Sequence, residues 1–211
     1  MKTYCIGLLS LLTMGSIQPV VASSADPLNT IQKKWAVCQY QSQDKEHQVY
    51  CLEKLIERNQ KALDDQPERP ELKVWLAINK GSLAGVNGGL GALSLVKEAK
   101  VLLEQVIEQA PETLDGSAYT SLGSLYYQVP GWPIGFGDDE MAEKMLKKAL
   151  EINPDGIDSN YFYGDFLAED GRKVDALTYL KRAQQAKARP DRPLADMGRQ
   201  KEIEKRIGEL N

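Results

Sequence analysis

Apolar and small residues recur in the second half of the chain at steps of four and three residues. Residues at this spacing lie on one face of a helix, so the pattern predicts amphipathic helices that pack through small side chains. A proline follows each run and marks where its helix ends. Alternating apolar and polar positions, which would predict strands, are nearly absent, and we therefore expect an all-α fold. The runs with their prolines are Ala142, Leu146, Ala149 and Pro154, and Ala176, Leu180, Ala183 and Pro190.

The same pattern occurs twice more upstream, which indicates internal repeats. Each run would form the second helix of a hairpin of two antiparallel helices. We predict four such hairpins, over about residues 28–67, 69–111, 115–154 and 156–190. The upstream copies are Ala99, Leu103, Val106 and Pro111 and, more weakly, Leu55, Asn59, Ala62 and Pro67.

Two prolines break the helical pattern within 189–193, after the fourth hairpin. Residues 194–210 resume it, with apolar positions at steps of four and three. We expect one terminal amphipathic helix here, which covers the exposed end of the last hairpin. Residues 23–211 would then form a single domain.

The first 22 residues have the order of a secretory signal peptide. Lys2 supplies the positive start, the stretch 6–17 is mostly apolar, and small residues precede a cleavage site after Ala22, with Ala25 as the less favoured site. The apolar stretch is too short to anchor the chain in a bilayer. We therefore expect residues 1–22 to be removed and the mature protein to be exported to the periplasm.

Export changes the interpretation of the two remaining cysteines, Cys38 and Cys51. They lie on either side of a polar stretch at 41–48, and a turn between helices there would place them at the same height on facing helices. An oxidising compartment favours a disulfide between them. The alternative is a pair of buried free thiols, which also occur as small core residues.

The third and fourth predicted hairpins share a first-helix motif, in which a large residue and a glycine are followed by a second large residue three positions later. The motif is Leu122, Gly123 and Tyr126 in one hairpin and Tyr163, Gly164 and Leu167 in the other. Together with the small-large-small runs, it resembles the tetratricopeptide repeat (TPR) family, most strongly in the C-terminal half. The resemblance implies a right-handed α-solenoid of about four hairpins plus a capping helix, whose first helices line a concave binding surface.

Two of the predicted hairpins are longer than this family's spacing between the helices. In the third hairpin the distance from Gly123 to Ala142 is 19 residues, whereas the corresponding distance in the fourth is the family's usual 12. We expect two extended loops within hairpins, one at 128–137 and one at 81–91. Insertions of this kind in solenoids map to loops on one face and often carry binding.

Large side chains on the inserted loop and on the first helices are the candidate binding residues. Trp132 and Phe136 in the loop would either tuck against the groove or face a partner. A tyrosine offers a rigid apolar ring with a hydroxyl, which suits recognition, and packing in the core is the alternative for each one. The candidate partner-binding residues are Trp132, Phe136, Tyr119, Tyr127, Asn160, Tyr161, Trp75 and Asn79.

Charge and composition disfavour several other classes of function. The 26 basic residues face 30 acidic ones without a strongly basic stretch, which argues against a nucleic-acid partner. His47 is the only histidine, so little material exists for a zinc site or a catalytic triad. The glycine-rich stretch 81–91 lacks the Gly-Lys-Ser/Thr ending of a phosphate-binding loop, and the acidic run 138–140 is interpreted as a helix cap. We expect no enzymatic activity, no cofactor and no metal.

Two functions of different class follow. In the first, the chain is a scaffold that binds a segment of a periplasmic or envelope protein through its groove and the 128–137 loop. In the alternative, it is a small-ligand-binding accessory component of a solute-uptake system, because the loop is faintly similar to the T component of TRAP transporters. The alternative predicts a closed apolar cavity near Trp75, Trp132 and Tyr161, with a small organic solute as ligand. Homo-oligomerisation stays open in both.

Overall fold

A computed structural model of the protein describes residues 26–211, and the predicted signal peptide at 1–22 lies outside these residues. The part of the chain described consists of helices and their connections, without strands, and this confirms the all-α prediction. No helix within it is long and apolar enough to cross a membrane. The helices are α1 (Pro27–Tyr40), α2 (Lys45–Asp65), α3 (Pro70–Asn87), α4 (Gly89–Gln109), α5 (Thr113–Gln128), α6 (Asp139–Ile152), α7 (Ile157–Glu169), α8 (Lys173–Gln184) and α9 (Pro193–Leu210).

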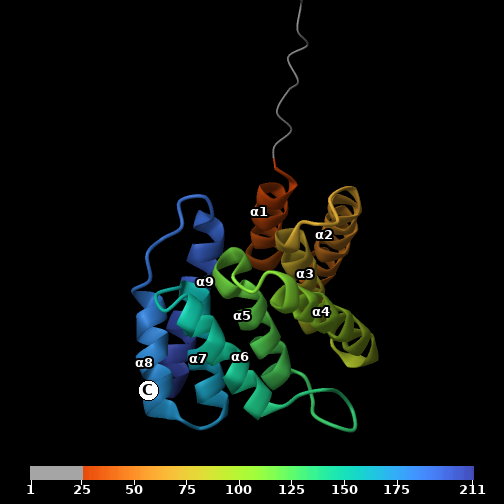
Figure 1. Cartoon of the computed structure of the whole chain (residues 1–211). Helices are drawn as coiled ribbons and strands as arrows, with labels where there is room; N and C mark the ends of the chain where they lie inside the picture. Colours follow the sequence, from red (N-terminus) through yellow and green to blue (C-terminus); the bar gives the residue numbers. More distant parts are fainter. Residues whose placement is uncertain (1–25) are drawn as a thin grey trace, which may run out of the picture.

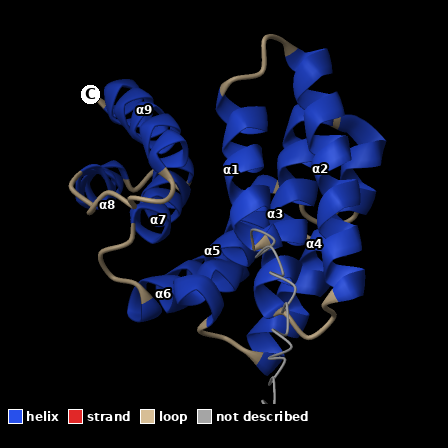
Figure 2. Cartoon of the chain, turned by 90° about the horizontal axis from the view of Figure 1, so that it is seen from above, coloured by secondary structure: helices blue, strands red, loops and turns tan. Residues whose placement is uncertain are grey.

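The helices pair in chain order into four hairpins, and α9 follows the last of them (Figure 1). Successive hairpins pack side by side, so that α1, α3, α5 and α7 contact one another in turn. Seen from above, the array curves round from α1 to α9 (Figure 2). This arrangement is the α-solenoid that the repeats predicted.

Two glycines on first helices allow close contact between the helices of a hairpin. A Cβ at Gly123 would lie 2.6 Å from Cγ of Leu146, and one at Gly164 would lie 2.9 Å from Cγ of Leu180. Both leucines are completely buried, so the space that a larger residue would need is already filled. The small residues of the same two runs are also completely buried, namely Ala142, Ala149, Ala176 and Ala183.

The second hairpin differs from the prediction of a loop at 81–91. Gly88 alone separates α3 from α4. Its φ of 66° is a left-handed conformation that glycine adopts readily, and it reverses the chain within one residue. Leu83 and Ala84 are buried, which keeps this end of α3 helical against the core. The extra residues of this hairpin therefore lengthen its helices and form no extended loop.

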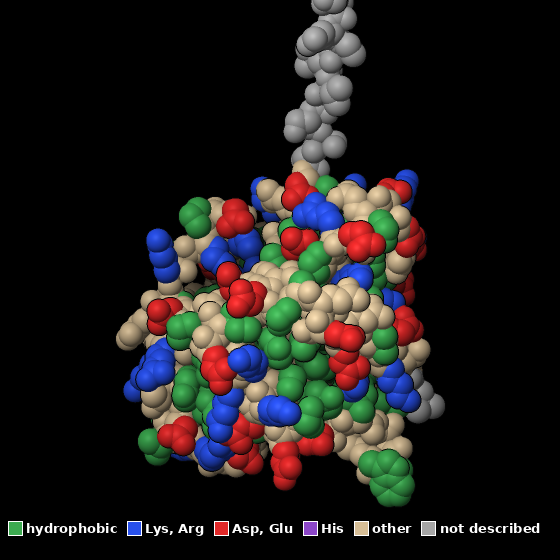
Figure 3. Space-filling view, viewed as in Figure 1, with side chains coloured by type: hydrophobic (Ala, Val, Ile, Leu, Met, Phe, Trp, Pro, Cys, Tyr) green, Lys and Arg blue, Asp and Glu red, His purple; other side chains and the backbone are tan. Residues whose placement is uncertain are grey.

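The insertion in the third hairpin does form a loop, between α5 and α6. Phe136 packs edge-on against Tyr126, with ring centroids 5.7 Å apart, and the Gly137 N–H donates to the Pro130 carbonyl at 3.0 Å. Trp132 is 90% exposed, and Figure 3 shows apolar atoms projecting at the corner where this loop lies. The loop thus uses one aromatic residue for packing and presents the other to solvent.

A disulfide joins α1 to α2 between Cys38 and Cys51, whose Cα atoms lie 5.5 Å apart. It confirms the predicted bridge over the alternative of two free thiols. Cys38 is completely buried within the apolar cluster of the first three helices. The bridge therefore holds the first hairpin together next to the part of the core that it shares with α3.

The terminal helix α9 covers more than the last hairpin. Ile203 packs against Ile157 of α7, as expected of a cap. Ala195, near the start of α9, instead belongs to the apolar cluster of the first three helices. The ring of Tyr40, at the end of α1, lies over Gly198 and leaves no room for a Cβ there. α9 therefore connects the last hairpin to the first across the concave side.

Gly164→Ala should destabilise the fold, because the new Cβ would lie 3.1 Å from the backbone nitrogen of Leu180 as well as against its side chain. We expect the free energy of unfolding to fall by about 1–3 kcal/mol, as is typical of overpacking. In the matched control Gly85→Ala the Cβ meets nothing within 4 Å, and helix propensity should raise that free energy by up to about 1 kcal/mol. Urea denaturation followed by circular dichroism measures both. Equal effects of the two substitutions would contradict the close-contact argument.

Removing the disulfide should lower the free energy of unfolding by about 3 kcal/mol in the chain-entropy description of such a short loop. The double variant Cys38→Ala, Cys51→Ala and the wild type are compared by urea denaturation with and without dithiothreitol. Reduction should bring the wild type close to the variant and leave the variant unchanged. A wild-type midpoint that does not respond to reduction would show that the bridge adds no stability.

Candidate binding site in the concave cavity

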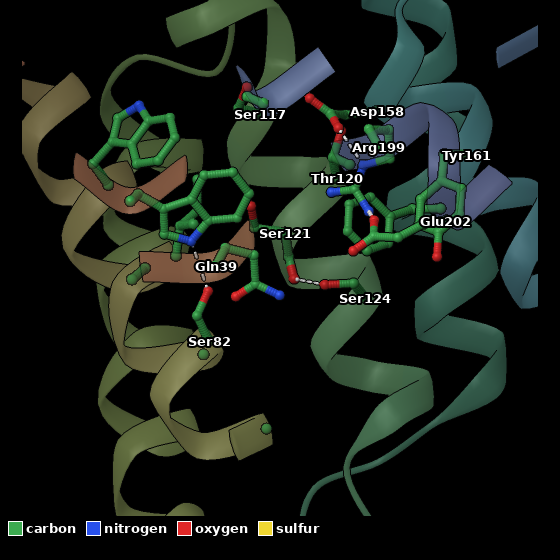
Figure 4. A pocket seen from close by; sticks show the side chains of 18 of the residues that line it. Gln39, Ser82, Ser117, Thr120, Ser121, Ser124, Asp158, Tyr161, Arg199 and Glu202 are labelled. Carbon is green, nitrogen blue, oxygen red and sulfur yellow. Dashed lines mark hydrogen bonds and ion pairs between the residues drawn. The ribbon is translucent and has the colours of Figure 1, made fainter. Parts of the chain in front are cut away.

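The concave side of the array encloses a cavity of about 510 Å³. Residues of α1, α3, α5 and α7 form most of its walls, and α9 with the segment before it forms the remaining side (Figure 4). This volume lies within the range of small-molecule sites in proteins. Among residues 26–211, no group of three or more His, Cys, Asp and Glu is arranged to hold a metal ion.

A row of hydroxyl side chains on α5 forms one wall. Ser117, Ser121 and Ser124 line the cavity, with Gln128 one turn further, and their spacing places them on one helix face. The Ser117 hydroxyl donates to the Leu114 carbonyl at 2.6 Å, and the Ser124 hydroxyl donates to the Ser121 carbonyl at 2.8 Å. Since these protons are used within the helix, the oxygen lone pairs remain to accept hydrogen bonds from a ligand.

α1 and α3 supply an aromatic wall. Trp35 and Trp75 meet edge to face, with ring centroids 5.6 Å apart, and only 3% of Trp75 is exposed. The Trp35 indole N–H donates to the Ser82 hydroxyl at 2.9 Å, which fixes the orientation of its ring (Figure 4). Rigid aromatic faces of this kind suit an apolar group of a ligand.

A cluster of ion pairs from α7, α9 and the segment between α8 and α9 forms a third wall. Asp158 accepts hydrogen bonds from Arg189 at 2.7 Å and from Arg199 at 2.9 Å. Arg189 also donates to Asp196 at 2.7 Å, and Arg199 pairs with Glu202. Figure 4 shows this cluster and the α1 side of the cavity on opposite sides of the α5 hydroxyls.

The two carboxyl groups that face Arg199 differ in their protonation. Burial alone would raise the pKa of Asp158, but the charges of Arg199 and Arg189 outweigh burial and hold that pKa well below its ordinary value. Burial raises the pKa of Glu202 above its ordinary value in spite of Arg199. Asp158 is therefore the fixed anion of the cluster, and Glu202 takes up a proton more readily.

Among the predicted binding residues, the structure brings Trp75 and Tyr161 together in this cavity. The Arg199 guanidinium lies over the Tyr161 ring, with 4.3 Å from Cζ to the ring centroid. Burial raises the pKa of the Tyr161 hydroxyl to about 12. This hydroxyl therefore stays protonated at neutral pH.

Asn79 and Asn160 do not line the groove, contrary to the prediction, because both are completely buried. The Asn160 amide donates to the carbonyls of Pro154 at 2.7 Å and Gly156 at 2.9 Å, which ties α7 to the turn before it. The Asn79 amide donates to the side-chain oxygen of Asn59 at 3.0 Å. Both side chains therefore connect parts of the fold and are not available to a partner.

The remaining predicted residues lie outside the cavity lining. The Tyr127 hydroxyl donates to Asp165 at 2.7 Å and so connects α5 to α7. Tyr119 is partly buried, while Phe136 and Trp132 belong to the loop between α5 and α6. Binding of a partner by these residues stays a prediction, and it is independent of the cavity.

The serines of α5 and the arginines of the ion-pair cluster were not among the predicted binding residues. The serine spacing was visible as a polar stripe, but a polar helix face usually faces solvent. The arginines lie in and just before α9, and their position depends on where α9 packs. No local pattern in the sequence places α9 beside α1.

Asp158→Asn should lower the free energy of unfolding at pH 7 by about 1–3 kcal/mol, because Arg189 and Arg199 would lose the half-buried carboxylate that they share. Each arginine would keep its second acidic partner. The wild-type stabilisation also depends on pH. Since the folded-state pKa of Asp158 is depressed below its ordinary value of 3.8, the stabilisation is fully present above about pH 4 and is lost as the pH falls further. Urea midpoints between pH 7 and pH 3 should therefore fall less for the variant than for the wild type.

A control for this prediction is Glu57→Gln, which removes an exposed pair with Lys54 on α2. It should leave the free energy of unfolding nearly unchanged, because water screens an exposed ion pair. If the Asp158 variant were as stable as this control at pH 7, the ion-pair cluster would not hold α9 in place.

The fold as a whole is similar to solved structures. The crystal structure of TTC0263, described as a thermophilic TPR protein in Thermus thermophilus, has a TM-score of 0.57 and 21% sequence identity, over 85% of this chain and 83% of that chain. Two structures of MamA AMB-1 are also 21% identical and cover 88% of this chain, with 93% and 100% of their own chains. Their TM-scores of 0.38 and 0.39 are too low to support an argument.

No protein-family model and no curated protein matches the sequence. The faint likeness to the T component of TRAP transporters stays a prediction. At 21% identity, the likeness to TTC0263 concerns the fold and not the function. Together with the stacked hairpins, it shows that this chain has a tetratricopeptide-repeat-like fold.

Proposed function

We propose that this protein is an exported binding protein that holds a segment of another periplasmic or envelope protein in its concave cavity. The observation that carries the proposal is the cavity, which lies on the inner face of a TPR-like array and is bordered by α1, α3, α5, α7 and α9. Its walls combine hydrogen-bond acceptors, aromatic faces and charged groups. They can therefore contact the main chain and the side chains of a polypeptide at the same time.

The hydroxyl row on α5 supports a polypeptide as the ligand. Amide N–H groups on one side of an extended chain recur at roughly 7 Å, since each residue spans about 3.4 Å. Ser117 and Ser121 are separated by about 6 Å along the helix axis at about 1.5 Å per residue. Both hydroxyl oxygens can accept hydrogen bonds, and Ser117 already uses its proton on the Leu114 carbonyl. The two oxygens therefore match the donors that an extended main chain presents. Side chains of the segment would then reach the wall formed by Trp35 and Trp75.

Two features support export as part of the proposal. The order of residues 1–22 is typical of a signal peptide. The disulfide between Cys38 and Cys51 is of the kind that persists in oxidising compartments. We do not extend the proposal to a solute transporter, because Trp132 does not line the cavity that this alternative required it to close.

The charged groups of the cavity favour binding over catalysis. Asp158, Arg189 and Arg199 are joined in ion pairs with one another. An acid held between two arginines keeps its charge and has no proton to transfer at neutral pH. Glu202, whose pKa burial raises, takes up a proton more readily, but it is engaged by Arg199. We therefore propose that the protein has no enzymatic activity.

A photo-crosslinking amino acid placed at Ser121 should capture a defined polypeptide in intact cells, and the product should appear in the periplasmic fraction. The same amino acid at exposed Val174 on α8 should not. Gly85→Leu should abolish the crosslink, because Gly85 lines the cavity and a Cβ there has open space to fill. Gly208→Leu, also with open space but outside the cavity, should leave the crosslink unchanged.

Circular dichroism of the purified variants checks that both leucine substitutions leave the helices intact. A crosslink that survives Gly85→Leu, or one of equal strength from position 174, would show that the cavity does not hold the segment. A product confined to the cytoplasm would overturn the proposed location.

A further inference from the structure

The three arginines beside the cavity differ in whether the guanidinium forms an ion pair with an acidic side chain. Arg189 and Arg199 share Asp158 and have further acidic partners of their own. The Arg192 guanidinium makes no ion pair and no hydrogen bond with any residue in 26–211, although it lines the cavity. Its Nε is buried without an acceptor. Arg192 is therefore the arginine of this wall with unused donors.

The fold holds Arg192 in this position by contacts that leave those donors free. Its Cζ lies 5.0 Å from the centroid of the Trp75 ring, a cation–π distance. Its backbone N–H donates to the Arg189 carbonyl at 3.0 Å, and Pro193 begins α9 directly after it. Burial and the neighbouring charge of Arg189 lower the pKa of Arg192, and they outweigh the nearby carboxylates, which raise it without forming an ion pair. A half-buried cation with an unpaired donor costs free energy, and an anion placed against it would recover part of that cost.

The charge balance of the wall favours a ligand with a single negative charge. Three acidic side chains balance the three arginines of this wall, and exposed Asp191 adds a fourth carboxylate that acts on Arg192. The ion pairs already made leave one arginine open, which is enough for one carboxylate. A doubly charged phosphate would place a second charge beside the carboxylates without a cation to meet it. The acidic side chains are Asp158, Asp196 and Glu202.

We propose that Arg192 anchors a carboxylate of the ligand, and that Trp35 and Trp75 receive an apolar group next to that carboxylate. The guanidinium offers a planar pair of donors, which fits a carboxylate in bidentate geometry. This inference rests on the proposed function, because it makes the carboxylate the side chain of an Asp or Glu in the bound protein segment. An apolar residue beside that acidic residue would complete the recognised pair.

The test uses two blocked dipeptides that differ only in charge, acetyl-Phe-Glu-amide and acetyl-Phe-Gln-amide, titrated by calorimetry at millimolar concentrations. The wild type should bind the Glu peptide about tenfold more tightly, which is the effect of one charge-assisted hydrogen-bonded contact. Arg192→Gln should bind both peptides equally. Arg182→Gln is the matched control, since Arg182 also lies over an aromatic ring, Tyr179 at 5.1 Å, but is exposed outside the cavity. This control should keep the tenfold preference.

Two further measurements separate binding from packing. Arg192→Gln should unfold at the same or a higher urea concentration than the wild type, because it removes a half-buried charge that forms no ion pair. A clearly lower midpoint would make Arg192 a structural contact of Trp75 and overturn the inference. Arg192→Lys keeps the charge without the planar donor pair, and it should retain part of the preference for the Glu peptide. Complete loss of the preference in this variant would contradict a charge-based anchor.

A second pair of probes, 3-phenylpropionate and 3-phenylpropionamide, distinguishes a free organic acid from a protein segment. If the free acid binds through Arg192 and neither dipeptide binds, the carboxylate anchor stands and the protein-segment function falls. If the wild type binds the Glu and Gln peptides equally, the anchor falls while the segment-binding function stands. Preference for the Glu peptide that survives Arg192→Gln also overturns the anchor.

Discussion

Close contact between the two helices of the third and fourth hairpins is the constraint on which the array depends. Gly123 and Gly164 allow Leu146 and Leu180 to fill the space beside the first helices. A single hairpin cannot bury its apolar face, so the hairpins must stack to form a common core. Stacking with every first helix on the same side leaves α1, α3, α5 and α7 along the inside of the curve (Figure 2).

The inner face becomes a cavity because α9 reaches back to the first hairpin. The contact of Tyr40 with Gly198, and the burial of Ala195 among residues of the first helices, hold α9 there. The same segment carries the arginines that line the cavity. The packing of α9 against the first hairpin thus both closes the cavity and places charged side chains in its wall.

The candidate site could be predicted only in part. Trp75 and Tyr161 were found because aromatic residues on first helices face either the core or the groove, and these two line the cavity. Asn79 and Asn160 do not face the groove as predicted. A side-chain amide can hydrogen-bond within the fold as readily as to a ligand, and both amides here bond to groups of the protein itself. The extra residues at 81–91 gave a similar error, since glycines permit a loop but do not prevent a helix with a buried apolar face.

Local patterns along the chain were enough to predict the helical hairpins, their close contacts and the Cys38–Cys51 bridge, because each depends on residues close together in the sequence. Helical periodicity and the spacing between residues predict contacts of this kind directly. The position of α9, and with it which arginines obtain partners and which one does not, followed from tertiary packing alone. Trp75 and Arg192 belong to opposite ends of the array, and their contact at 5.0 Å exists only once the hairpins between them have stacked. This distance depends on how several hairpins pack on one another, and no short stretch of the sequence encodes that.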